Sequence, residues 1–140
     1  MTDQTYTVSG FAVPEGLDEL HGVLAQAAEE HPAVGAAAFM LFETAVIEIA
    51  GNVVEHGRPV GSVRWTFSLT VEADRLRGSL SDDGEELEGD PTDASLPDDP
   101  LADSGRGLAL ARATLDELDY RRQDGVNVWH MVRRLQADGS

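Results

Sequence analysis

The chain has 140 residues, of which 41% are hydrophobic, and this size and apolar fraction suit one folded domain spanning residues 1–140. Its formal net charge is -16, so long-range repulsion argues against direct binding to nucleic acid or to an anionic membrane. The sequence contains no cysteine, which excludes disulfides, thiol catalysis and thiolate metal sites together.

The first half of the chain predicts one strand followed by two helices. The strand is expected at residues 6–13, after a start that lacks the basic and apolar runs of a signal peptide. Residues 16–29 place leucine and alanine at helical spacing, and a longer helix is expected at residues 34–55. The longest apolar run without a charge, residues 33–42, is too short to span a bilayer. We therefore expect a cytoplasmic protein with no membrane partner.

Two hairpins are expected in the second half. Residues 62–71 alternate apolar and polar side chains, and a short turn leads from them into a second strand at residues 76–80. A last pair of strands, around residues 118–122 and 126–135, turns at Asp124-Gly125, a favoured hairpin dipeptide. Helices over one face of such a sheet form a two-layer α+β sandwich.

The segment from Asp82 to Ser104 interrupts this pattern. It holds three prolines, few apolar residues and many acids. A connection of that length inside a compact domain is either a functional lid or a disordered insert. Helical spacing resumes with Leu108, Ala111 and Leu115 and extends toward Leu118.

Glu48 and Asn52 are the first candidate site residues, because they lie on adjacent turns of an otherwise apolar helix. A carboxylate and an amide that are buried there need a polar partner to offset their desolvation, and a metal-bound nucleotide would provide one. Glu48 is placed to act as a general base, and Asn52 offers an amide oxygen to Mg²⁺. The alternative is that both residues cap or bridge polar groups at the end of the helix.

Two further motifs lie downstream. Asp82 follows a strand directly, and Gly84 permits close backbone approach, so a carboxylate that accepts the amino group of adenine is chemically sensible. A simple turn is the alternative. Gly105-Arg106-Gly107-Leu108 is expected to open a helix, whose unpaired backbone N–H groups favour an anion such as a triphosphate. Arg106 either contacts phosphate or is a solvated surface charge.

The succession of these features resembles the nucleotide site of the GHKL (Bergerat-fold) superfamily. The order is an acid-and-amide helix, a hairpin, Asp-x-Gly after its second strand, a long loop, and a glycine pair at a helix, and it covers about residues 13–135. The resemblance implies a mixed, mainly antiparallel sheet with helices on one face. It also implies an ATP lid at about residues 85–104.

The resemblance further implies ATP and Mg²⁺ as cofactors and a role for each motif. Glu48 would activate the attacking hydroxyl, Asn52 would bind magnesium, and Asp82 would read adenine. The glycines would shape the pocket, within a nucleotide-binding set of Gly84, Gly105, Arg106, Gly107 and Leu108. His56 also matches the family pattern, although a histidine at a helix end needs no direct role.

Within the superfamily, the chain resembles the anti-sigma factor serine/threonine kinase branch, including the ending Arg133-Arg134-Leu135. That branch implies a protein that sequesters a sigma factor and transfers the γ-phosphate of ATP to an anti-anti-sigma (STAS-type) protein, with a possible homodimer. One alternative is a non-catalytic partner-switching module on the same fold with weak or no nucleotide binding. Another is a divalent-metal site formed by Glu48, Asn52 and His56 without nucleotide.

Three departures from the family pattern favour the non-catalytic alternative. Glu86 stands where a second glycine is usual, and eight acids without one basic residue fill the expected lid. A threonine that normally helps to hold the adenine-reading aspartate is absent, with Val126 and Asn127 near its place. Asn127 has an amide that could replace the threonine as a hydrogen-bond donor, whereas Val126 has no polar group.

Overall fold

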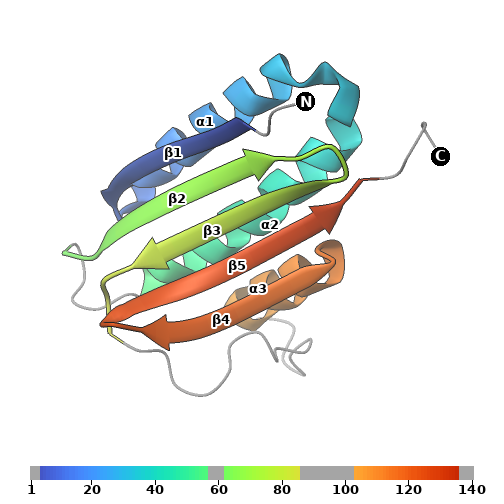
Figure 1. Cartoon of the computed structure of the whole chain (residues 1–140). Helices are drawn as coiled ribbons and strands as arrows, with labels where there is room; N and C mark the ends of the chain where they lie inside the picture. The colour runs from blue at the N-terminus through green and yellow to red at the C-terminus, as the bar shows by residue number, and fades with distance from the viewer. Residues whose placement is uncertain (1–3, 57–61, 86–102, 136–140) are drawn as a thin grey trace.

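The structure is a computed structural model, and it describes residues 4–56, 62–85 and 103–135. Within these ranges, the side chains of His56 and of residues 103–108 are outside the description. Figure 1 shows two layers, a five-stranded sheet and three helices that all cover one of its faces. The predicted two-layer α+β sandwich is therefore confirmed.

The sheet has the strand order β1-β2-β3-β5-β4, and each neighbouring pair is antiparallel. The expected mainly antiparallel character is thus confirmed, and the five described strands have only antiparallel neighbours. Both predicted hairpins are present, and Asp124 and Gly125 form the second turn with φ of 52° and 84°. The strands are β1 (Gln4–Phe11), β2 (Arg64–Val71), β3 (Arg75–Asp82), β4 (Glu117–Gln123) and β5 (Val126–Arg134).

The three helices are α1 (Leu17–Glu30), α2 (Ala36–His56) and α3 (Asp103–Thr114). Short 3-10 turns at Pro14–Gly16 and Pro32–Val34 precede the first two. The helix α2 begins two residues later than predicted, because Gly35, with φ of 98°, separates it from the second turn. Leu118, which the helical spacing had reached, lies in β4 instead.

The core lies between α2 and the middle of the sheet. Phe42, Val46 and Ile49 of α2 are fully buried. A Cβ atom at Gly78 of β3 would lie 3.0 Å from the tip of the Phe42 ring, so glycine there lets the helix approach the strand closely. This contact fixes α2 at the centre of the sheet.

The helix α2 is also long and apolar enough to cross a membrane, with a mean hydropathy of 1.6 over Ala36–Glu55. The longest uncharged apolar run is much shorter than this helix, because Glu43 and Glu48 interrupt it. The core helix of a soluble domain passes the same test. In this structure α2 packs against α1, α3 and the sheet, as a core helix does.

Candidate functional site

The elements that hold the predicted site residues meet at one end of the sheet. In Figure 1 the carboxyl end of α2, the end of β3 and the turn between β4 and β5 lie together at that end. The helix α3 ends beside the opposite end, where Asp116 N donates to Val132 O, and α3 packs along α2. Its first residue is therefore directed back toward the end that holds Asp82 and the last turns of α2.

Asp82 is buried at the end of β3, with 4% of its surface exposed. Its Oδ1 atom accepts a hydrogen bond from Gly84 N at 3.0 Å and one from Asn127 Nδ2 at 2.9 Å. Burial raises the pKa of the Asp82 carboxyl above its ordinary value, and the two hydrogen bonds oppose that rise. No residue in the described ranges donates to Oδ2, so that oxygen is available to a ligand.

Asn127 stands directly opposite Asp82 in the register between β3 and β5. It is 2% exposed, and its side chain lies on the helix-covered face with the buried Trp129 and Met131. The sequence had suggested that Asn127 could replace a missing threonine as the donor that holds Asp82. The hydrogen bond between the two side chains confirms this contact.

The backbone after Asp82 is held from two sides. On one side Arg64 N donates to Asp83 Oδ1 at 2.7 Å, and Asp83 N donates to Arg64 O at 3.1 Å. On the other side Arg122 Nη1 donates to Gly84 O at 2.6 Å, and Asn127 Nδ2 donates to Glu85 O at 2.9 Å. The Asp-x-Gly turn therefore has a fixed position at the edge of the helix layer.

In the part of the chain that the structure describes, Glu48 and Asn52 are not held by protein hydrogen bonds as Asp82 is, and they are less buried than the sequence predicted. Both side chains are half-buried, not fully buried, so their desolvation is smaller than the sequence suggested. Neither side chain has a hydrogen-bond partner among the residues that the structure describes. The alternative that they bridge protein groups at the helix end has no support in these ranges, and both side chains can accept an outside partner.

The glycine pair lies inside α3. The helix begins at Asp103, two residues before Gly105, so the motif from Gly105 to Leu108 occupies the first turns and does not precede the helix. This corrects the expected helix start. The roles of Arg106 and Leu108 depend on side chains outside the description and stay predictions. The expected lid, including Glu86, falls almost wholly in residues 86–102, outside the described residues.

At this site a metal ion would need coordinating atoms from a bound nucleotide as well as from the protein. The described residues contain no group of three His, Asp or Glu side chains that could hold a metal ion by themselves. The nucleotide-free site of Glu48, Asn52 and His56 cannot be assembled from the description, which leaves out the His56 side chain. The amide oxygen of Asn52 fits Mg²⁺ that is shared with phosphate oxygens.

Comparison with known proteins decides the family. A family model described as "Histidine kinase-like ATPase domain" matches residues 12–133 of the chain. The chain belongs to this family.

This histidine kinase-like ATPase domain is 31% identical over 101 residues to a protein named serine-protein kinase RsbW from Halalkalibacterium halodurans. The match covers 67% of the chain and 61% of that relative, so the chain spans less than two thirds of the relative's length. A crystal structure of the RsbU and RsbW domains of a Mycobacterium tuberculosis protein is similar over 94% of the chain and 32% of its own, with a TM-score of 0.59 and 20% identity. At that identity the second likeness shows the fold alone.

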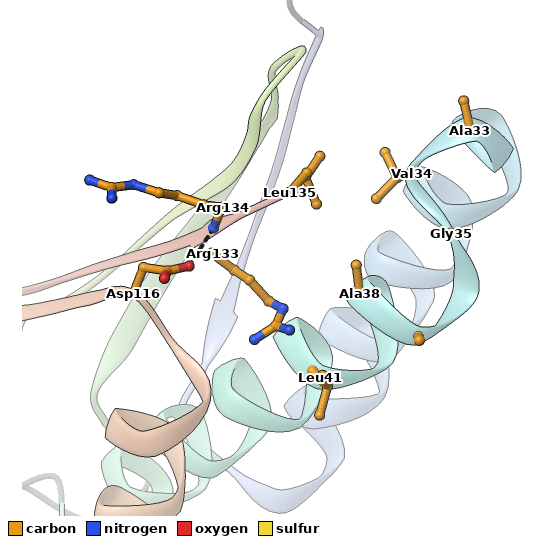
Figure 2. A pocket seen from close by; sticks show the side chains of 10 residues that line it. Ala33, Val34, Gly35, Ala38, Leu41, Asp116, Arg133, Arg134 and Leu135 are labelled. Carbon is orange, nitrogen blue, oxygen red and sulfur yellow. Dashed lines mark hydrogen bonds between the residues drawn. The ribbon is translucent and has the colours of Figure 1, made fainter. Parts of the chain in front are cut away.

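The histidine kinase-like ATPase domain also has a groove away from the predicted site. Figure 2 shows it at the start of α2, beside the last residues of β5. Its volume is about 620 Å³. Arg133 extends into this region, where its Nη1 donates to Thr114 O at 2.5 Å and satisfies the last carbonyl of α3. Arg133, the first residue of the Arg-Arg-Leu motif, thus has a structural role here, far from Asp82.

Sequence analysis missed two residues that contact the site of this ATPase domain. Tyr120 and Arg122 of β4 both donate to Oδ1 of Asn127. A signal was present, because Leu118, Tyr120 and Arg122 alternate onto the same face of the strand. Arg122 itself is exposed, and its guanidinium donates to acceptors at this end of the sheet, one of which is the carbonyl of Gly84.

Proposed function

We propose that the protein is an ATP-dependent anti-sigma factor and a serine/threonine protein kinase. The observation that carries the proposal is the placement of two kinds of group at one end of the sheet. Asp82 is held by the protein with one carboxylate oxygen available, while Glu48 and Asn52 have no protein partner in the described ranges. The family and the similarity to a serine-protein kinase support the same reading.

Each residue then has one task. Asp82 accepts a hydrogen bond from the amino group of adenine through Oδ2, because Oδ1 is already used. Asn52 would hold Mg²⁺ through its amide oxygen, and the metal, when bound, would supply positive charge beside the phosphates. Glu48, one turn earlier on the same helix, accepts the proton of the attacking serine or threonine hydroxyl. The backbone at Gly105 and Gly107, in the first turns of α3, lies near phosphate, since a helix start favours anions.

The partners follow from the proposed activity. The protein would sequester a sigma factor in the cytoplasm and phosphorylate the STAS-type anti-anti-sigma protein that competes for it. A homodimer is compatible with this arrangement. Because the charge of -16 disfavours contact with nucleic acid, regulation of transcription would act through protein contacts.

The alternative, a binding module without catalysis, has lost one of its three supports. That support was the absence of the threonine that usually helps to hold Asp82, and Asn127 donates to Asp82 in its place. The other two supports, Glu86 and the acidic lid, lie outside the described residues. A measurement of nucleotide binding therefore distinguishes the kinase from the non-catalytic module.

Calorimetric titration tests the proposal. The protein is titrated with ATP and with ADP, each with and without Mg²⁺, and the series is repeated on Asn52→Ala. We expect magnesium-dependent ATP binding that falls at least about tenfold in the variant, because a hard-cation ligand is lost. Gln26→Ala on α1 is the control, since it removes an exposed amide far from Asp82. Absence of binding at millimolar nucleotide would contradict the kinase reading and leave the non-catalytic module.

A further inference from the structure

Tyr120 and Arg122 have no role in the proposed reaction, although both contact the residue that holds Asp82. They lie on the edge strand β4, and β5 separates that strand from β3. The hydroxyl of Tyr120 donates to Oδ1 of Asn127, and Arg122 Nη1 donates to the same atom at 3.2 Å. The Tyr120 ring packs against Trp129, with 4.9 Å between ring centres, and Trp129 is fully buried.

These two donors determine which way the Asn127 amide faces. The amide has one accepting atom, Oδ1, and one donating atom, Nδ2. Because Tyr120 and Arg122 both donate, Oδ1 must face them, and Nδ2 must face Asp82. With the amide reversed, its oxygen would lie against the Asp82 carboxylate and its NH₂ against the Arg122 guanidinium, which has no accepting atom. The edge strand therefore fixes the donor that Asp82 receives.

Arg122 also contacts the turn itself. Its Nη1 donates to Gly84 O at 2.6 Å, while Asn127 Nδ2 donates to Glu85 O at 2.9 Å. One guanidinium thus holds both the amide that orients Asp82 and the backbone two residues after Asp82. Without it, Asp82 would keep its place in β3 and its own two hydrogen bonds, but the Asn127 amide and the Gly84 carbonyl would lose a group that holds them in position.

We infer that Tyr120 and Arg122 are positioning residues for base recognition, acting through Asn127 to hold the Asp82 carboxylate where it meets the amino group of a purine. The inference rests on the proposed nucleotide site, and it assigns selectivity for an amino-bearing purine to β4. The two residues touch neither phosphate nor Mg²⁺ in this scheme. Their loss should therefore reduce recognition of the base and leave the remainder of the nucleotide site intact.

The test compares two nucleotides that differ in one group. Titrations use the magnesium complexes of ATP and of purine riboside triphosphate, which lacks the 6-amino group. We expect the unmodified protein to bind ATP at least about tenfold more tightly, the usual worth of a hydrogen bond to a charged group. In Arg122→Leu this ratio should fall to about threefold or less, and in Tyr120→Phe it should be intermediate. A residue that only stabilises the fold would weaken both ligands equally and leave the ratio unchanged.

Arg121→Leu is the matched control, because Arg121 is the neighbouring arginine on the other face of β4. It should keep the ratio of the unmodified protein. If Arg122→Leu does not unfold cooperatively, Tyr120→Phe and Asn127→Thr provide the measurement. An unchanged ratio in the folded variants would overturn the inference while the nucleotide site stands. Equal binding of both nucleotides by the unmodified protein would overturn it as well, and no binding of either would overturn the proposed function itself.

Discussion

Two polar regions at the same end of the molecule are built in opposite ways. Around Asp82 nearly every polar atom meets another protein group, through Asn127, Arg122 and the backbone at Gly84. On α2, Glu48 and Asn52 are half-buried and have no hydrogen-bond partner in the described ranges. The first region is organised by the protein itself, whereas the second would be satisfied by the proposed nucleotide and its metal.

The difference has an energetic meaning. A satisfied buried network contributes to folding, and removing one member leaves the others unpaired. A half-buried pair without partners contributes little to folding, so its polar groups cost stability unless something binds them. Stability and activity should therefore respond in opposite ways to substitutions in the two regions.

The largest expected effect is on phosphoryl transfer. Glu48→Gln removes the proposed base while keeping the size of the side chain, so transfer to a STAS-type partner should fall by about 100-fold or more. ATP affinity should change by less than about threefold, because Glu48 takes no part in the proposed adenine and magnesium contacts. Transfer is measured with radiolabelled ATP, and Glu43→Gln, another acid on α2, is the control. Unchanged transfer in Glu48→Gln would show that the base is elsewhere.

The next effect is on binding. Asp82→Asn keeps an oxygen that can accept from Asn127 and Gly84, but it presents an NH₂ group to the amino group of adenine. ATP affinity should fall at least about tenfold, while the free energy of unfolding stays the same or rises by up to about 1 kcal/mol. Asp83→Asn, whose carboxylate faces Arg64 N, should leave the affinity unchanged. Calorimetry and denaturant unfolding give the two values, and a variant that loses stability together with affinity would contradict this separation.

The same replacement, asparagine by alanine, can be made in both regions to compare their contributions to stability. Asn127→Ala removes one hydrogen-bond partner each from Asp82, Tyr120 and Arg122 and should lower the free energy of unfolding by about 1–3 kcal/mol. Asn52→Ala should leave it unchanged or raise it by about 0.5 kcal/mol, since alanine favours the helix more than asparagine does. Urea titrations of the two variants without nucleotide measure both changes. Equal losses would mean that Asn52 has a structural role.

The smallest effect is a pH dependence. Because burial raises the pKa of Asp82 above its ordinary 3.8, the folded state binds a proton there more tightly than the unfolded state. The stability from this group is fully present below pH 3.8 and is lost as the pH rises through the folded-state pKa. The unmodified protein should thus be more stable relative to Asp82→Asn at acid pH than at pH 7. Urea titrations across this range measure the difference, and a flat difference would contradict the raised pKa.

The sequence predicted the fold because its signals were local. Alternating side chains at residues 62–71 and the Asp124-Gly125 dipeptide each determine their own element, and both agree with the structure. The start of α3 was misplaced by two residues, because glycine is a weak helix former and the pair looked like a boundary. The network at Asp82 joins residues about 40 positions apart, and only Asn127 was anticipated. Strand order decides such contacts, and no short segment of sequence encodes strand order.

The contact between Gly78 and Phe42 joins the strand that holds Asp82 to the helix that holds Glu48 and Asn52. Gly78 lies four residues before Asp82 on β3, and Phe42 lies six residues before Glu48 on α2. The covalent structure of a nucleotide limits the distance between its base and its phosphates, so the spacing of the strand and the helix has to lie within that range. Because Gly78 has no side chain, Phe42 can approach β3 closely, and this contact in the core helps to set the spacing between the strand and the helix.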